Sequence, residues 1–206
     1  MIFTHRRGFT LMELLIVIAL LCLLMVLLVP AFTSIAQGGG MKRAIGAASD
    51  ALEVARTDAM STSTWVLVGF ADTTAQNPGK ISQLTIFTMG SRDGTTNMAA
   101  NNLRPLYRPV HIDNVKLLSS PSKWADGATV LKGSPFAFTA TNNNTTVNVS
   151  DTIVAFSPRG EAIINPAAMN SWIELPLREM RGTQEVEEKT ASVRVSGMSG
   201  QVMVSY

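Results

Sequence analysis

One apolar stretch near the start of the chain limits what the whole chain can fold into. Residues 14–29 contain no charged and no strongly polar side chain. If residues 9–36 form one α-helix, its rise of about 1.5 Å per residue makes it roughly 42 Å long, enough to cross a bilayer. Arg6 and Arg7 precede the apolar residues. The sequence therefore predicts a membrane-spanning helix whose N-terminal end stays in the cytoplasm.

One acidic residue interrupts this apolar segment. Glu13 lies one helical turn after Phe9, and an unpaired carboxylate in lipid is costly unless it is neutralised. Cleavage between Gly8 and Phe9 would create a new α-amine four residues before Glu13. Such an amine would neutralise the glutamate of a neighbouring copy, so the pattern favours an anchor that is processed and then assembles.

The residues around the glutamate form a motif, namely Gly8, Phe9, Thr10, Leu11, Glu13 and, after the apolar run, Pro30. This motif resembles the class III signal of type IV pilins and type II secretion pseudopilins. The resemblance implies that residues 1–8 are a leader, that a prepilin peptidase cuts between Gly8 and Phe9, and that Phe9 is then N-methylated. It further implies that Glu13 serves filament assembly and that Pro30 kinks or loosens the helix.

Three simpler explanations of the N-terminus compete with this resemblance. A secretory signal peptide would use Ser34-Ile35-Ala36 as its cleavage site, but the apolar run is too long for such a signal. A lipoprotein signal would need a small residue before Cys22, where a leucine stands, and is rejected. A plain single-span anchor leaves Gly8 and Glu13 unexplained.

A glycine-rich hinge and a second helix follow the apolar segment. Residues 38–40 are three glycines, and each costs about 1 kcal/mol relative to alanine in a helix. Helical spacing then returns in a stripe of small and apolar residues, namely Met41, Ile45, Ala48, Leu52, Ala55 and Ala59. The sequence therefore predicts a transmembrane and filament-core helix over 9–36, and a glycine hinge with an amphipathic stem helix over 37–61.

The remaining residues, 62–206, have the alternating and threonine-rich pattern of a β-rich head domain. Residues 90–102 are polar and predict an exposed, mobile loop. Strands are expected at 64–70, 81–89, 110–118, 133–140, 145–156 and 172–175, followed by a hairpin over 191–206. Residues 141–144, Thr-Asn-Asn-Asn, are turn-rich and suggest that the strands on either side of them form a hairpin. The expected fold class is α+β and pilin-like, with a long N-terminal transmembrane and stem helix packed on an antiparallel β-sheet head.

Three short segments of the head resemble the GspH/FimT-type minor pseudopilin domain. Residues 55–59, Ala-Arg-Thr-Asp-Ala, look like the start of that domain, and residues 156–160, Phe-Ser-Pro-Arg-Gly, look like its strand and turn. The terminal hairpin over 191–206 is also similar. The resemblance implies a structural subunit of a type II secretion or type IV pilus-like filament. Its expected partners are the prepilin peptidase and methyltransferase, other pilins or pseudopilins, and inner-membrane lipid, with a periplasmic head that later lies in a periplasmic or surface filament.

Composition and residue types argue against catalysis and metal binding. The net charge is +2 with 16% charged residues, which indicates no strongly charged partner. Cys22 is the one cysteine, so no intrachain disulfide forms. His111 is the one histidine outside the predicted leader, so no transition-metal cluster or catalytic triad is expected. Asp93, Gly94 and Asn97 are more typical of an exposed turn than of a calcium loop. We therefore expect no enzyme activity, no cofactor and no metal.

DNA uptake or adhesion is the alternative function on the same fold. Some FimT-type minor pilins bind DNA through basic residues after the last glycine of the terminal hairpin. Here Gln201 and Met203 stand where arginines would neutralise phosphate, so we expect no nucleic-acid partner. A membrane-anchored β-domain of another function is the third class.

Overall fold

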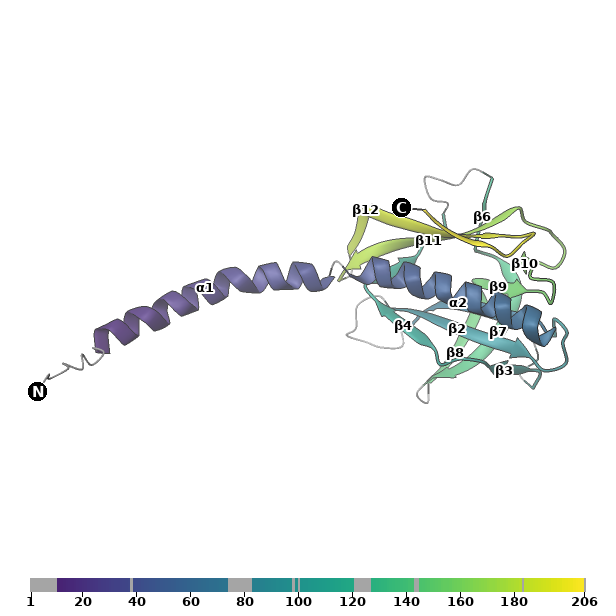
Figure 1. Ribbon diagram of the computed structural model, residues 1–206, viewed down its shortest axis with the longest axis horizontal. Helices are drawn as coiled ribbons and strands as arrows, with labels where there is room; N and C mark the ends of the chain where they lie inside the picture. Colours follow the sequence, from purple (N-terminus) through teal and green to yellow (C-terminus); the bar gives the residue numbers. More distant parts are fainter. Residues whose placement is uncertain are drawn as a thin grey trace, which may run out of the picture. The chain divides into compact units, whose positions relative to one another are not determined.

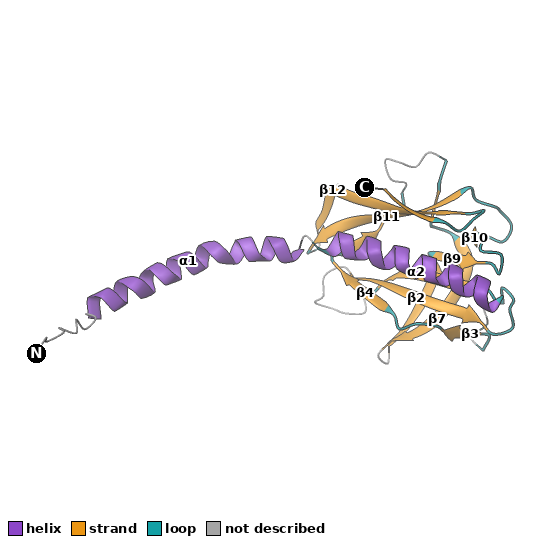
Figure 2. Ribbon diagram, in the orientation of Figure 1, coloured by secondary structure: helices purple, strands orange, loops and turns teal. Residues whose placement is uncertain are grey.

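The computed structural model divides the chain into two compact units, Met1–Gly39 and Gly40–Tyr206, which we describe separately (Figure 1, Figure 2). The backbone is described for residues 11–37, 39–73, 83–97, 99, 101–120, 127–142, 145–182 and 184–205. Side chains are described over the same ranges, except for residues 27–37, 141, 142 and 145.

The first unit contains helix α1, Leu11–Gln37, which has 27 residues. Leucine and methionine favour a helix because they lose little rotamer freedom in one. Glu13 lies in the first turn, where the helix dipole favours a negative charge. The side chains of residues 11–26 are all exposed. Within the described residues, no helix reaches the length and apolarity needed to cross a membrane.

The second unit begins with helix α2, Gly40–Thr62. Its buried face confirms the predicted stripe and adds one residue, Ala44, to Met41, Ile45, Ala48, Leu52, Ala55 and Ala59. Four of these seven side chains are alanines, which let the sheets approach the helix closely. The helix ends before Ser63, whose φ of 52° is left-handed, and the Thr64 amide donates to the Ala59 carbonyl over 3.2 Å.

The larger sheet, sheet A, has the strand order β10-β9-β1-β2-β3, with β4 also paired to β2, and its pairings are antiparallel. Its strands are β1 Val66–Asp72, β2 Gln83–Ser91, β3 Leu103–Pro105, β4 Val110–Asp113, β9 Ile153–Phe156 and β10 Ala162–Ile163. Every residue of β2 is buried. Leu84 and Ile86 belong to the cluster that includes α2, whereas Phe87 and Met89 belong to a second cluster. Sheet A therefore has a hydrophobic core on each face.

The smaller sheet, sheet B, has the order β13-β12-β11-β5, and β6 pairs with β11 in parallel. Its strands are β5 Val115–Leu117, β6 Thr129–Val130, β11 Trp172–Arg181, β12 Gln184–Ser196 and β13 Val202–Ser205. The strand expected at 172–175 was too short, because β11 pairs with β12 as far as Arg181. The hairpin expected over 191–206 is present as the pair β12 and β13.

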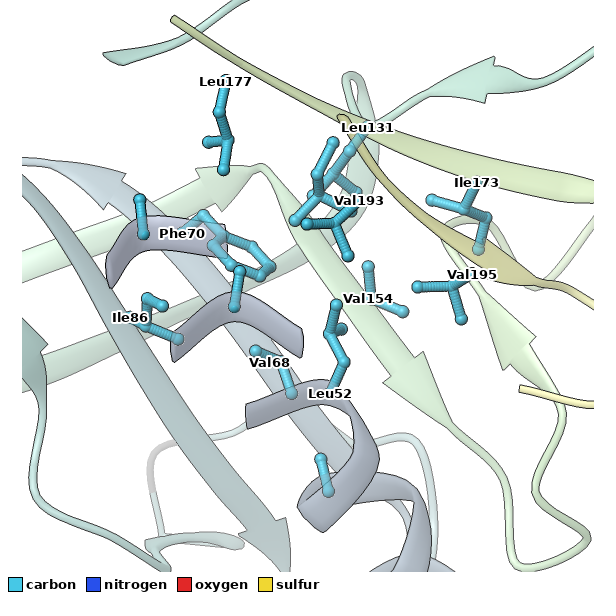
Figure 3. Close-up of a cluster of buried hydrophobic side chains, with 14 of the residues drawn as sticks. Leu52, Val68, Phe70, Ile86, Leu131, Val154, Ile173, Leu177, Val193 and Val195 are labelled. Atoms are coloured by element: carbon cyan, nitrogen blue, oxygen red, sulfur yellow. The ribbon is translucent and has the colours of Figure 1, made fainter. Parts of the chain in front are cut away.

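Helix α2 and the two sheets share one core. Figure 3 shows Leu52 of α2 in a cluster with Val68 and Val154 of sheet A and Val193 and Val195 of sheet B. All five side chains are fully buried. The α+β class, with a helix packed on antiparallel β-sheet, is confirmed.

A separate hairpin covers the other face of sheet A. It consists of β7, Ser134–Asn142, and β8, Thr145–Asp151, as the turn-rich sequence between them predicted. A Cβ atom added at Gly69 of β1 would lie 2.6 Å from Val149 Cγ1 and 2.7 Å from Phe138 Cζ. Glycine at this position therefore allows the hairpin to pack directly on the backbone of β1.

The chain changes sheets at two residues with a left-handed backbone, and both changes correct the sequence prediction. The strand expected at 110–118 is divided at Asn114, φ 64°, into β4 of sheet A and β5 of sheet B. The strand expected at 145–156 is divided at Asp151, φ 65°, into β8 of the hairpin and β9 of sheet A. Asn and Asp tolerate this conformation better than other side chains with a Cβ, so they suit such corners.

Candidate functional site

The residues predicted for processing and assembly lie at the start of the first unit. Gly8 and Phe9 lie outside the described residues. Glu13 is in the first turn of α1 with an exposed side chain. Pro30 lies inside α1, which continues to Gln37, and a proline at such a position removes one backbone hydrogen bond.

In the head, the structure brings together three segments that the sequence presents separately. Arg56 belongs to α2, Gly160 to the turn between β9 and β10, and Gly200 to the turn between β12 and β13. A Cβ atom added at Gly200 would lie 2.2 Å from the Gly160 carbonyl oxygen and 2.9 Å from Arg56 Cδ. One added at Gly160 would lie 2.8 Å from Met60 Sδ. We call Arg56, Met60, Gly160 and Gly200 the helix–turn junction.

Both turns of the junction are closed by their own hydrogen bonds. The Gly160 amide donates to the Ser157 carbonyl over 2.9 Å, and the Gly200 amide donates to the Ser196 carbonyl over 2.7 Å. Both glycines have positive φ, 84° at Gly160 and 65° at Gly200. Glycine adopts this left-handed backbone conformation without the steric cost that a Cβ atom would add. The Nε atom of Arg56 is buried without a hydrogen-bond partner among the described atoms. The junction thus has the character of a packing contact that positions two turns against α2.

The loop after β2 is organised around Asp93, and most of its described residues are exposed, as the sequence predicted. Asp93 Oδ1 accepts hydrogen bonds from the Thr95 amide at 2.9 Å, Thr95 Oγ1 at 2.8 Å, Asn102 Nδ2 at 2.8 Å and Ser91 Oγ at 2.9 Å. These bonds, led by the Thr95 amide, lower the pKa of Asp93 to about 2. Asn102 Nδ2 also donates to the Asn97 carbonyl over 2.8 Å. Short polar side chains that bind nearby backbone groups explain this order.

The residues considered for metal binding or catalysis do not come together. Among the described residues, no group of three or more His, Cys, Asp and Glu side chains could hold a metal ion. His111 Nδ1 lies 2.9 Å from Thr85 Oγ1, which in turn lies 2.9 Å from Thr73 Oγ1. This chain of hydroxyl groups links β2 with β4 and gives His111 a structural partner.

The N-terminal segment supplies the link to known proteins. Residues 3–29 match the family model of the prokaryotic N-terminal methylation motif. The methylation motif includes Gly8, Phe9 and Glu13, and it ends one residue before Pro30. Comparison with curated proteins and with solved structures gives no significant match. The motif thus supports a pilin-like precursor.

Beyond the methylation motif, sequence reasoning missed several polar contacts of the head. Tyr107 donates a hydrogen bond of 2.7 Å to Asp58 Oδ2 on α2, and this bond raises the pKa of Tyr107. In sheet B, Glu185 pairs with Lys116 at 2.9 Å and Arg178 at 2.7 Å, which lowers the pKa of Glu185. No sequence signal marks the pairs of Tyr107 with Asp58 and of Lys116 with Glu185, because their partners lie 49 and 69 residues apart along the chain.

Proposed function

We propose that the chain is the precursor of a structural minor pseudopilin of the GspH/FimT type, a subunit of a type II secretion or type IV pilus-like filament. The observation that carries this proposal is the methylation motif at residues 3–29. A prepilin peptidase cuts the precursor between Gly8 and Phe9 and methylates the new N-terminal Phe9. Residues 1–8 leave as the leader.

The mature N-terminal helix acts first as an anchor and then as the filament core. Its described side chains are almost all aliphatic and exposed, so they suit the lipid of the inner membrane and the equivalent helices of neighbouring subunits. In lipid, helices associate by packing and by polar contacts rather than by the hydrophobic effect. Pairing of Glu13 with the Phe9 α-amine of a neighbouring subunit supplies such a contact and sets the axial register. Pro30 gives the helix the freedom to bend within the bundle.

The head contributes a surface and no chemistry. Its described polar clusters, around Asp93, His111 and Glu185, are satisfied by hydrogen bonds or ion pairs with other residues of the head. We therefore assign it the outer layer of the filament, in the periplasm, where it contacts other subunits. Gln201 and Met203 favour this role over DNA uptake, because neither side chain is cationic.

The mature N-terminus tests the proposal directly. Mass spectrometry of the protein purified from its host should give a polypeptide that begins with methylated Phe9. The variant Gly8→Ala should keep the leader and stay in the membrane fraction. Gly39→Ala is the matched control, since a Cβ atom there meets nothing within 4 Å, and it should be processed normally. A native chain beginning at Met1 or at Gln37 would refute the proposal.

A further inference from the structure

Two methionines project from loops that lie together on the head. Met169 is 84% exposed and Met198 is 80% exposed, the highest values among the large hydrophobic side chains described in the second unit. Met169 precedes β11 and Met198 lies in the turn between β12 and β13. Exposed apolar side chains that gather at one place mark interaction surfaces, and methionine adapts readily to a partner.

A small pocket lies between these methionines, and we call it the methionine pocket. Its volume is about 90 Å³, and it is lined by Glu161, Ile163, Met169, Asn170, Gly197 and Met198. Pockets for cofactors and drug-sized ligands start at about 300 Å³. The methionine pocket therefore has room for one side chain and not for a cofactor.

The wall of the methionine pocket is held rigidly. A Cβ atom added at Gly197 would lie 1.7 Å from the Asn170 carbonyl oxygen, so the two backbones are in direct contact. The Gly197 amide donates to the Ser171 carbonyl over 3.0 Å, and the Ala162 amide donates to the Gly197 carbonyl over 2.9 Å. The pocket therefore exists before any partner arrives.

Asn170 and Glu161 supply the polar side chains of the pocket. The Asn170 side chain donates through Nδ2 to Thr129 Oγ1 over 2.9 Å, whereas its Oδ1 is buried without a hydrogen-bond partner among the described atoms. Glu161 carries a carboxylate whose Oε2 accepts from Ser157 Oγ at 3.2 Å. Within the described part of the chain, Glu161 forms no ion pair. A carboxylate without an ion pair beside apolar walls suits a cationic donor with an apolar stem.

We propose that the methionine pocket receives a lysine side chain from a neighbouring subunit of the filament. The aliphatic stem of the lysine lies between Met169 and Met198, and its ammonium group donates to the Glu161 carboxylate. Lysine fits because it has three donors, no acceptor and an unbranched stem. This inference rests on the proposed function, because the neighbouring subunit exists only if the chain assembles.

A lysine-directed crosslink tests the inference in the full-length protein expressed in its host. In a Cys22→Ala background, Met198→Cys is treated with a short reagent that joins a thiol to an amine. We expect a crosslink from position 198 to a lysine of another subunit, mapped by mass spectrometry. Met203→Cys is the matched control, since Met203 is 51% exposed and lies on β13 but is not one of the residues that line the pocket. It should give no such product.

A charge variant separates specific docking from proximity. Glu161→Gln keeps the size of the side chain and should reduce the crosslink from position 198 about fivefold, as expected for one charge-assisted contact at a partly exposed site. Equal yields from positions 198 and 203, or a yield insensitive to Glu161→Gln, would overturn the inference. The N-terminus is measured in the same cells. An unprocessed chain refutes the proposed function, whereas a processed chain without the crosslink refutes only the docking of a lysine.

Discussion

Replacement of Gly200 by alanine should destabilise the head through two separable effects. The first is backbone strain, because Gly200 has a φ of 65°, which costs a residue with a Cβ atom about 1 kcal/mol. The second is a collision, because the added Cβ atom would lie 2.2 Å from the Gly160 carbonyl oxygen and 2.9 Å from Arg56 Cδ. Carbonyl oxygens of a hydrogen-bonded turn do not move freely. We expect a total loss of about 2–4 kcal/mol in the free energy of unfolding.

A second glycine isolates the strain effect. Gly182 has the same φ of 65°, but a Cβ atom there meets nothing within 4 Å. Gly182→Ala should therefore lose only about 1 kcal/mol. The difference between the two variants, about 1–3 kcal/mol, measures the helix–turn junction itself.

Urea denaturation of a fragment of residues 40–206 is the appropriate assay, because the two described hydrophobic clusters lie entirely within this unit. The midpoint should fall for both variants, and further for Gly200→Ala, with an unchanged slope. In thermal unfolding, each 1 kcal/mol corresponds to a shift of about 2–4 °C for a domain of this size. Equal losses for the two alanine variants would refute the reasoning, because they would show that the turns do not touch as the structure has them.

Three further predictions concern the core and two hydrogen-bonded side chains. Leu52→Ala should lower the free energy of unfolding by about 2–5 kcal/mol, because Leu52 is fully buried. Val54 is 40% exposed, so Val54→Ala should change the free energy of unfolding by less than about 0.5 kcal/mol. Urea denaturation of the two variants measures the difference. The pKa of Asp93 in the folded state is about 2, below its ordinary value of 3.8. The stability that the ionised Asp93 contributes is therefore fully present above about pH 4 and is lost as the pH falls towards 2. The protection factor of the Thr95 amide in hydrogen exchange should fall over that range, and Asp93→Asn should remove this pH dependence of the protection factor. The pKa of Tyr107 is raised in the folded state, so the stability that its hydroxyl contributes is fully present below pH 10 and is lost as the pH rises through the folded pKa. Urea midpoints measured over a pH series should show this alkaline loss, and Tyr107→Phe should abolish it.

Local periodicity predicted the elements that depend only on neighbouring residues. The stripe from Met41 to Ala59 has helical spacing and is the buried face of α2. The hairpin of β7 and β8 was foreseen from the polar turn between two threonine-rich strands. The terminal hairpin was foreseen from alternating valines beside a glycine-rich turn.

Features that depend on long-range packing were not predictable in the same way. Asn114 and Asp151 are residue types that favour turns, but nothing in the local sequence shows that each is where the chain leaves one sheet for another. Arg56, Gly160 and Gly200 appear in three distant segments, and only the fold shows that they form one contact. A glycine inside a strand pattern does signal a close approach, but it does not say which element approaches.

The placement of β7 and β8 over sheet A has a consequence for any shorter version of this domain. Leu67, Phe87 and Met89 are shielded from water in the cluster that contains this hairpin. Removing the hairpin would expose a hydrophobic surface to water, and such a surface promotes aggregation. A relative trimmed in this way would need hydrophilic side chains at those three sites, and its position 69 would be released from the requirement for glycine.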